Sequence, residues 1–258
     1  MNTTNKHQIT RVRRETRRRI LSVTEVNQLT PAMRRIHFRS DDLFDFTSES
    51  PDDHIKVFLP LLADSENVAA TECMRDYTPR KFDAKRGTLT IDFALHKAGP
   101  ATMWARSAKI GDPLEIGGPR GSAIVADDFD WYLLIGDETA LPAIGRRLEE
   151  LRPGVPVTTL VIVNAADEHQ ALPTRASNNP LWIHRARQAL DDSTLLQLAL
   201  ANTMLPPGEG YVWIAAEARV ARSARTYVTE TLGHPRQWVK AAGYWSAGAA
   251  ATHETIQD

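Results

Sequence analysis

Three side chains within one short segment carry the functional groups that a nucleotide cofactor needs. In RDYTPR, Arg75 offers a planar cation to phosphate, Tyr77 an aromatic face with a polar tip, and Thr78 a hydroxyl. If residues 75–78 run extended, Arg75 and Tyr77 share one face and Thr78 takes the other. A flavin dinucleotide combines phosphates with a flat ring bearing oxygens and nitrogens, so it fits this set. Taken alone, the motif is also what a polar strand end contains, and without context that interpretation is favoured.

A turn of small residues leading into a helix forms a second candidate anion site. GPATMWA begins at Gly99 and places Pro100 and Thr102 where the first residues of a helix belong. Backbone N–H groups at such a helix start, together with the Thr102 hydroxyl, point at an anion. With Arg75 on the other side, the two segments make a two-sided phosphate clamp. His96 lies between them, and it is either a surface or capping residue, the commoner case, or a contact of the dinucleotide.

The elements that must position these residues are strands in the first half of the chain. Five stretches show period-two alternation or many β-branched residues, and turn residues bound them. They cover residues 20–29, 33–40, 54–60, 87–96 and 112–119, and one short helix is predicted over 99–108. Short strands at this spacing predict an antiparallel barrel or sandwich.

The second half alternates between strands and helices. Strands are predicted at 130–136, 157–164, 181–186, 211–217 and 238–245, and helices at 141–151, 193–204 and 218–232. This order predicts βαβ units and a Rossmann-like parallel α/β domain. We place the domain boundary near Asp127, which gives domains of residues 1–127 and 128–258.

The segment IGDETALPA, residues 135–143, runs from the first strand of the α/β half into its first helix. Ligands of open α/β sheets bind at the carboxyl ends of the strands, so the segment is a candidate site. It is not a G-x-G-x-x-G motif, and Asp137 and Glu138 would repel a pyrophosphate lying directly on them. Either the nucleotide sits differently from the usual Rossmann mode, or these acids cap the helix, and the two alternatives have equal weight.

The charge of the chain is balanced overall but uneven locally. The 258 residues carry a formal net charge of -1, so no global field attracts nucleic acid or membranes. The segment RVRRETRRRI, residues 11–20, is strongly basic. It is either a nucleic-acid-binding arm or a solvated lead-in to the first strand. We favour the second, because no aromatic residues are interleaved with the charges.

Several classes of protein are excluded by what the sequence lacks. A single cysteine, Cys73, excludes a disulfide framework and a zinc site built from cysteines, and it fits a reducing compartment. No apolar run has the length of a membrane span, and the N-terminus has no signal-peptide core. No metal-ligand cluster, Ser-His-Asp triad or pair of catalytic carboxylates is recognisable. We expect a cytoplasmic protein without nucleic-acid or membrane partners, and a monomer is compatible with this sequence.

Seven segments, in order and spread over nearly the whole chain, resemble the siderophore-interacting proteins. This family of ferric-siderophore reductases belongs to the ferredoxin-reductase-like flavoproteins. The segments are DDHIKVFLP, RDYTPR, IDFALHKAGPATMWA, GDPLEIGGPRGS, LLIGDETALPA, WIAAEARVARSAR and VKAAGYW. The resemblance implies an N-terminal β-barrel domain that binds FAD noncovalently. It also implies a C-terminal α/β domain that binds NADPH or NADH as electron donor.

The resemblance also implies which residues contact the cofactors. The RDYT residues would lie at the flavin and its phosphate, and the segment from His96 to Trp104 would hold the diphosphate. Trp245 lies in the last predicted strand and would cover the flavin ring or shape its pocket. The alternative, that Trp245 is a core aromatic without a cofactor contact, has even odds. The full implied set is Arg75, Asp76, Tyr77, Thr78, His96, Gly99, Ala101, Thr102, Trp104, Asp137, Thr139, Ala140 and Trp245.

Three basic residues are implied as substrate contacts. Lys56, Arg120 and Lys240 occupy positions that line the ferric-siderophore pocket in the reductase branch of the family. Ferric chelates of this kind are anionic, so fixed cations attract them. Each residue alone is more readily explained as a surface cation. The family often has arginine after the tryptophan of GYW, whereas this chain has Ser246, so a charge at that position is in doubt.

The expected function is FAD-dependent reduction of a ferric siderophore with NAD(P)H, which releases Fe(II) for iron assimilation. Iron would enter with the substrate, not as a protein-bound metal. The alternatives are a general flavin oxidoreductase with another acceptor, a siderophore-binding protein without turnover, and a nucleic-acid-binding protein that uses the basic arm. Arg219, Arg222 and Arg225 are either contacts of an NADPH 2′-phosphate or a solvated helix face.

Overall fold

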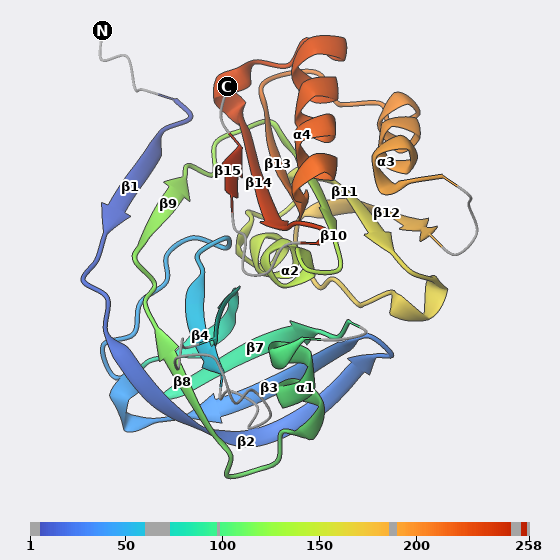
Figure 1. The fold of residues 1–258 in the computed structure, drawn as a ribbon. Helices are drawn as coiled ribbons and strands as arrows, with labels where there is room; N and C mark the ends of the chain where they lie inside the picture. Colours follow the sequence, from blue (N-terminus) through green and yellow to red (C-terminus); the bar gives the residue numbers. More distant parts are fainter. Residues whose placement is uncertain (1–5, 60–72, 97–98, 186–189, 249–253, 257–258) are drawn as a thin grey trace, which may run out of the picture. The chain divides into compact units, whose positions relative to one another are not determined.

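The computed structural model describes residues 6–59, 73–96, 99–185, 190–248 and 254–256 (Figure 1). The chain forms two compact units. Residues 9–125 make the first, and residues 1–8 together with 126–258 make the second. We call them the barrel unit and the α/β unit. Among the described residues, no helix has both the length and the apolar character needed to cross a membrane.

The barrel unit contains a seven-stranded sheet in the order β5-β4-β8-β2-β3-β7-β6, in which every neighbouring pair is antiparallel. Its strands are β2 (Arg18–Thr30), β3 (Met33–Arg39), β4 (Ile55–Leu59), β5 (Cys73–Tyr77), β6 (Pro79–Asp83), β7 (Thr88–Ala94) and β8 (Pro113–Gly117). A separate antiparallel ribbon joins β1 (Ile9–Arg13) to β9 (Gly121–Val125). The sheet curls into a half-barrel around helix α1 (Pro100–Ser107), as Figure 1 shows.

Period-two alternation builds the core of the barrel unit. Leu21 and Val23 of β2 point to the same side as Ile36 and Phe38 of β3, and all four are buried in one cluster. Ala105 of α1 joins the same cluster, so the helix closes the concave side of the sheet. The 3-10 helix η1 (Asp41–Leu43) follows β3.

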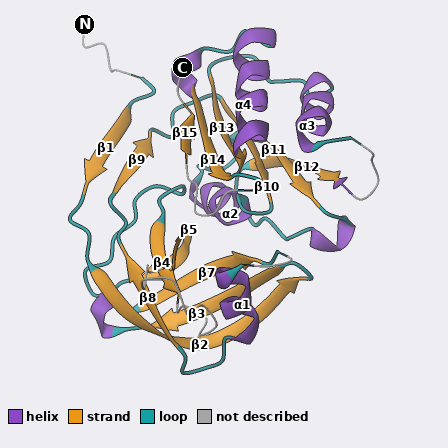
Figure 2. Cartoon of the chain, in the orientation of Figure 1, coloured by secondary structure: helices purple, strands orange, loops and turns teal. Residues whose placement is uncertain are grey.

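The α/β unit is built on a six-stranded sheet in the order β12-β11-β10-β13-β14-β15 (Figure 2). Its strands are β10 (Trp131–Asp137), β11 (Pro156–Val163), β12 (Ser177–His184), β13 (Gly210–Glu217), β14 (Val239–Trp245) and β15 (Glu254–Ile256). The first five are parallel, and β15 is antiparallel to β14, so the sheet is mixed. From β10 the chain proceeds to β11 and β12 on one side, then returns to β13 and β14 on the other. The topological switch point therefore lies between β10 and β13.

Helices cover both faces of this sheet. Helices α3 (Asp192–Ala201) and α4 (Ala218–Thr226) pack on the face that carries Leu133 and Ile135. Helix α2 (Leu141–Glu150) lies on the opposite face. A Cβ added at Gly136 would stand 2.4 Å from the Ala140 Cβ and 3.3 Å from Ile144, so only glycine permits this close approach. Shorter turns of helix are η2 (Ala166–Glu168), η5 (Arg236–Trp238) and the π-helical turn η4 (Tyr227–Thr231).

The predicted architecture is confirmed, with differences in individual elements. The antiparallel first half and the Rossmann-like second half are both present. The sequence missed β1, β5, β6, β9 and β15, and it began β12 at residue 181 instead of Ser177. The basic segment 11–20 contributes to β1 and β2. The two units change over between Val125 and Ala126, and residues before Ile9 group with the α/β unit. The division into cofactor-binding domains at residues 1–127 and 128–258 remains a prediction.

Candidate functional site

The RDYTPR segment begins in β5, an edge strand of the barrel sheet. Its register with β4 sets Arg75 opposite Val57 and Tyr77 opposite Ile55, two positions apart on each strand. The arginine and the tyrosine therefore share one face of the strand, as the sequence predicts. Thr78 follows between β5 and β6 and is buried.

An aromatic cluster links this strand to helix α1. The Tyr77 ring lies 4.5 Å from the Phe93 ring, and Phe93 lies 5.5 Å from Trp104 of α1, measured between centroids. Trp104 also stacks on Phe38 at 6.3 Å. Burial raises the pKa of the Tyr77 hydroxyl, so this group stays neutral and hydrogen-bonding at physiological pH. The two segments that sequence analysis singled out thus converge on one core.

The start of α1 has a backbone that only glycine adopts readily. Gly99 is the N-cap residue with φ of 132°, and a Cβ there would meet no atom within 4 Å, so the approach to the helix start is open. The Thr102 hydroxyl accepts a hydrogen bond from the His96 N–H at 3.1 Å. Arg106 donates to the His96 carbonyl at 3.3 Å. Ala101 packs partly buried against the core, and residues 97–98 lie outside the described residues.

An ion pair joins two of the predicted contacts directly. Lys56 and Asp76 are cross-strand partners in β4 and β5, and the Lys56 Nζ lies 2.8 Å from the Asp76 Oδ2. The other carboxylate oxygen of Asp76 is buried and has no hydrogen-bond partner among the described residues. Such an acceptor costs free energy unless another group donates to it.

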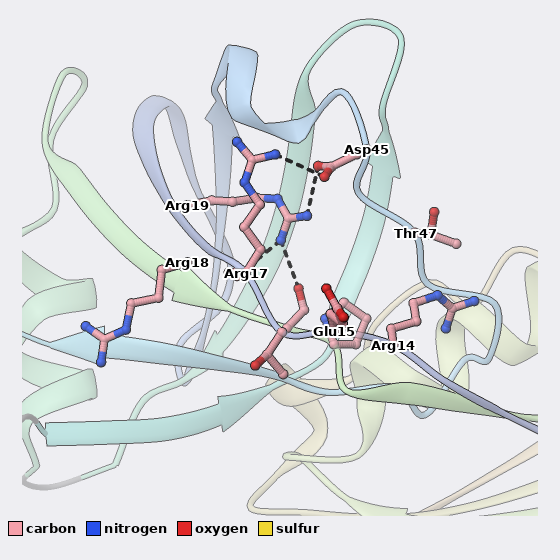
Figure 3. A pocket seen from close by; sticks show the side chains of 10 residues that line it. Arg14, Glu15, Arg17, Arg18, Arg19, Asp45 and Thr47 are labelled. Atoms are coloured by element: carbon pink, nitrogen blue, oxygen red, sulfur yellow. Dashed lines mark hydrogen bonds and ion pairs between the residues drawn. The ribbon is translucent and has the colours of Figure 1, made fainter.

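A polar pocket of about 550 Å³ in the barrel unit contains none of the predicted site residues (Figure 3). Its arginines point to carboxylates of the chain itself. Arg17 and Arg19 both bond to Asp45, at 3.0 and 2.9 Å. These hydrogen bonds, Arg19 first, hold the pKa of Asp45 below its usual value. The lining residues are Arg14, Glu15, Thr16, Arg17, Arg18, Arg19, Asp45, Thr47, Gly118 and Pro119.

Asp137 lies at the switch point of the α/β sheet and is almost fully buried. Its Oδ1 accepts from the Thr139 N–H at 2.9 Å and from the Thr139 hydroxyl at 2.5 Å. Its Oδ2 accepts from the Glu217 N–H at 3.1 Å and from the Trp245 indole N–H at 2.8 Å. One carboxylate therefore ties together the carboxyl ends of β10, β13 and β14.

The expectation that Asp137 or Glu138 caps α2 is wrong. The N-cap residue is Ala140, where no side chain accepts a helix N–H, and the Ala140 side chain is fully buried. Glu138 instead forms an ion pair with Arg185 at 2.8 Å. Burial, and then the charge of Asp137, raise the pKa of Glu138.

Two family models match the chain, one on each side of residue 125. The Siderophore-interacting FAD-binding domain matches residues 22–123, and the Siderophore-interacting protein model matches residues 129–248. The chain belongs to the siderophore-interacting protein family. The resemblance given by the sequence motifs is thereby confirmed.

Curated relatives and solved structures of the family cover the chain almost completely. The NADPH-dependent ferric-chelate reductase of Escherichia coli (strain K12) is 34% identical over 92% of this chain and 96% of its own length. Ferric vibriobactin reductase of Vibrio cholerae is 24% identical over 89% of this chain and 90% of its own. A siderophore utilization protein from T. fusca has a TM-score of 0.85 at 34% identity, covering 95% of this chain and 98% of that one.

A ferredoxin reductase of carbazole 1,9a-dioxygenase shares the fold. Its TM-score is 0.64 at 15% identity, covering 87% of this chain and 68% of that chain. The ferredoxin-reductase-like architecture is thus shown beyond the siderophore-interacting protein family.

The residues of the barrel unit fit the FAD that the family model names. The partnerless buried oxygen of Asp76 can accept a hydrogen bond from a bound group. Gly99 has no side chain, so the N-terminus of the eight-residue helix α1 is open to a phosphate. Arg75, Tyr77 and Thr78 offer the cation, the ring and the hydroxyl beside them.

Not every residue of the predicted sites lies in the same unit. Lys56 and the exposed Arg120 belong to the barrel unit, whereas Lys240 lies in β14 of the α/β unit. Their joint role as substrate contacts remains a prediction.

Sequence reasoning missed Glu217, which ends β13 and caps α4 by accepting from the N–H groups of Arg219 and Val220. Burial raises the pKa of Glu217, but backbone donors from Ala247 and these two residues outweigh it and leave the pKa lowered. An acid directly before a helix was the available signal.

Proposed function

We propose that this chain reduces ferric siderophores, using noncovalently bound FAD and electrons from NADPH. The observation that carries the proposal is the match of both family models, one over each half of the chain, with RDYTPR and the start of α1 inside the FAD-binding model. The names of the two curated reductases support the same activity.

The chemistry supplied by a bound FAD would be hydride acceptance from NADPH and single-electron transfer to ferric iron. The chain's own residues bind and orient. Arg75 would hold phosphate with its fork of donors, Tyr77 would offer its aromatic face to the ring system, and the first turn of α1 from Gly99 would hold the diphosphate. Electron transfer to ferric iron requires no proton transfer to the substrate.

The substrate is an anionic ferric chelate, and we assign its attraction to Lys56, Arg120 and Lys240. The Lys56–Asp76 ion pair fixes the ammonium at the end of β4, beside the strand that carries the flavin motif. Reduction weakens the hold of the siderophore on iron, so Fe(II) is the released product.

NADPH is assigned as the donor, with Arg219 as the first candidate for its 2′-phosphate. The Arg219 side chain is 78% exposed, and its ion pair with Glu217 is long, at 3.7 Å. Arg222 is in an ion pair with Glu254 of β15. We further propose a cytoplasmic location, which fractionation of the native cells tests.

One absorbance experiment tests the function. The purified protein, supplied with FAD, receives NADPH or NADH under anaerobic conditions and then a ferric catecholate. We expect the flavin band to bleach faster with NADPH and to return when the ferric chelate is added. A protein that binds no flavin, or whose reduced flavin ignores ferric chelates, contradicts the proposal.

The same absorbance experiment on two sets of variants separates ferric-siderophore reduction from the activity of a general flavin reductase. Lys56→Ala with Lys240→Ala should slow reoxidation by the ferric chelate and leave FAD content unchanged. Lys81→Ala, at an exposed position of β6, is the matched control. An unchanged rate in the double variant favours an oxidoreductase with a different acceptor.

A further inference from the structure

The segment before β1 is held on the α/β unit by one histidine. The backbone N–H of His7 donates to the Asp128 Oδ2 at 2.9 Å. Its ring Nδ1 lies 2.8 Å from the Asp128 Oδ1, and its ring Nε2 lies 2.9 Å from the Glu209 Oε2. Both ring nitrogens therefore face carboxylates that come from two different loops.

Aromatic packing fixes the same ring. His7 stacks on Phe129 with centroids 3.9 Å apart and planes 16° apart, and the edge of Trp238 meets it at 5.2 Å. The His7 side chain is only 5% exposed. Its backbone has φ of 60°, which makes it the one non-glycine residue with positive φ in the described part of the chain. Such a conformation persists where surrounding contacts enforce it.

Two carboxylates at one imidazole require a particular protonation state. A neutral imidazole has one N–H and one lone pair, so one nitrogen would face a carboxylate with lone pair against lone pair. Only the histidinium donates at both positions. Burial lowers the pKa of His7, but the hydrogen bonds to Glu209 and Asp128 outweigh it, so the pKa is raised above 6.5.

The other charged groups near His7 do not reverse its preference for the protonated ring. Lys6 Nζ lies 3.8 Å from the Glu209 Oε2 and shares that carboxylate. Asp130 accepts the Glu209 N–H at 2.7 Å, which brings a further carboxylate next to Glu209. The His234 ring lies 6.2 Å from the Trp238 ring between centroids, and burial lowers the pKa of His234.

We propose that His7 is a proton-operated clasp that fastens residues 6–8 to the α/β unit and opens when its ring loses the proton. The proposal is independent of the reductase activity. The chain passes between the units twice, between Gln8 and Ile9 and between Val125 and Ala126. The crossings are adjacent, because the Gln8 carbonyl accepts from the Ala126 N–H at 3.0 Å. When the clasp is open, the hydrogen bond between the Gln8 carbonyl and the Ala126 N–H still holds the two crossings together.

The sign of the pH dependence follows from the direction of the shift. Because the folded state binds the proton more tightly than the unfolded state, the stabilisation is complete below about pH 6.5. It is lost as the pH rises through the higher pKa of the folded state. Residues 6–8 should therefore be fastened in mildly acidic solution and released at a pH above the raised pKa of His7.

Hydrogen exchange by mass spectrometry on the full-length protein tests the clasp. Protection factors, corrected for intrinsic exchange, are compared between about pH 5.5 and about pH 9 for peptides covering residues 6–13. In the wild type we expect protection to fall roughly tenfold across this range. An NMR titration should place the pKa of His7 itself above 6.5.

Two opposite variants make the test decisive. His7→Gln should show low protection at every pH, and His7→Arg, which stays charged, should show no loss of protection between the two pH values. His169→Gln, an exposed histidine of the same unit, is the control and should behave as the wild type. The proposal is overturned if wild-type protection does not depend on pH, or if His7→Gln keeps the wild-type profile.

Discussion

Asp137 shows how a residue at a ligand-binding position can be used by the fold itself. Its two oxygens receive four hydrogen bonds from Thr139, Glu217 and Trp245. A buried carboxylate is tolerated only where donors of this number replace water. The acceptor capacity of Asp137 is thus largely used within the α/β unit, and its carboxylate serves to fix the Trp245 ring and the ends of three strands.

Replacing Asp137 should therefore affect stability more than flavin binding. Asp137→Asn leaves donors facing an amide, and we expect it to lower the free energy of unfolding by about 2–3 kcal/mol. Trp245→Phe removes a single donor and should cost about 1 kcal/mol. Urea unfolding measures both, and flavin titration measures the affinity for FAD. Normal stability with lost FAD affinity would instead make Asp137 a cofactor ligand.

At the scale of elements, α1 depends on one glycine at its start. Gly99 has φ of 132°, a conformation that residues with a Cβ rarely adopt, although there is room for the added atom. The same holds for Gly111, with φ of 93° and no neighbour within 4 Å, in the turn before β8. A residue with a Cβ would be similarly strained at either position, but only Gly99 begins the helix assigned to the diphosphate.

This pair allows the role of the helix start to be separated from strain. Gly99→Ala and Gly111→Ala should each lower the free energy of unfolding by about 1–2 kcal/mol. Only Gly99→Ala should also weaken FAD binding, by roughly tenfold, because it displaces the first N–H groups of α1. Thermal unfolding and flavin titration give the two readouts. Equal FAD affinities in the two variants would remove α1 from the diphosphate site.

The strands β2 and β3 were predictable from the sequence, whereas β1 was not. β2 and β3 alternate between core and solvent positions, so their periodicity is visible. The ribbon strand β1 is almost entirely exposed and carries no such pattern. Contacts such as Trp245 to Asp137 join residues far apart in the chain, and no local pattern shows them. The RDYT and GPATMWA motifs were visible because their chemistry is local.

On the scale of the whole molecule, the basic segment 11–20 is balanced by acids from elsewhere in the barrel unit. Arg17 pairs with Asp42 at 3.1 Å as well as with Asp45, and Arg18 pairs with Glu115 at 3.1 Å. Arg14 pairs with Glu49. With a formal net charge of -1 for the chain, this pairing reduces the cationic surface that the segment offers to a phosphate backbone. The segment forms parts of β1 and β2, so it is a structural element more than a solvated lead-in.

The arginine that should matter most for stability is Arg19. Its side chain is 6% exposed and donates to Asp45, to the Asp42 carbonyl at 3.0 Å and to the Gly118 carbonyl at 3.2 Å. Arg19→Ala removes the donor to both carbonyls and leaves Asp45 with Arg17 alone, and we expect it to lower the free energy of unfolding by about 2 kcal/mol. Arg13→Ala, at an exposed position of β1, is the control and should change the free energy of unfolding by less than about 0.5 kcal/mol.

Urea unfolding of the full-length protein measures the stability of both variants, and a gel-shift assay with duplex DNA is run on the same samples. If Arg19→Ala unfolds like the wild type but abolishes a salt-sensitive DNA shift, the segment binds nucleic acid and its pairing with the barrel acids is incidental.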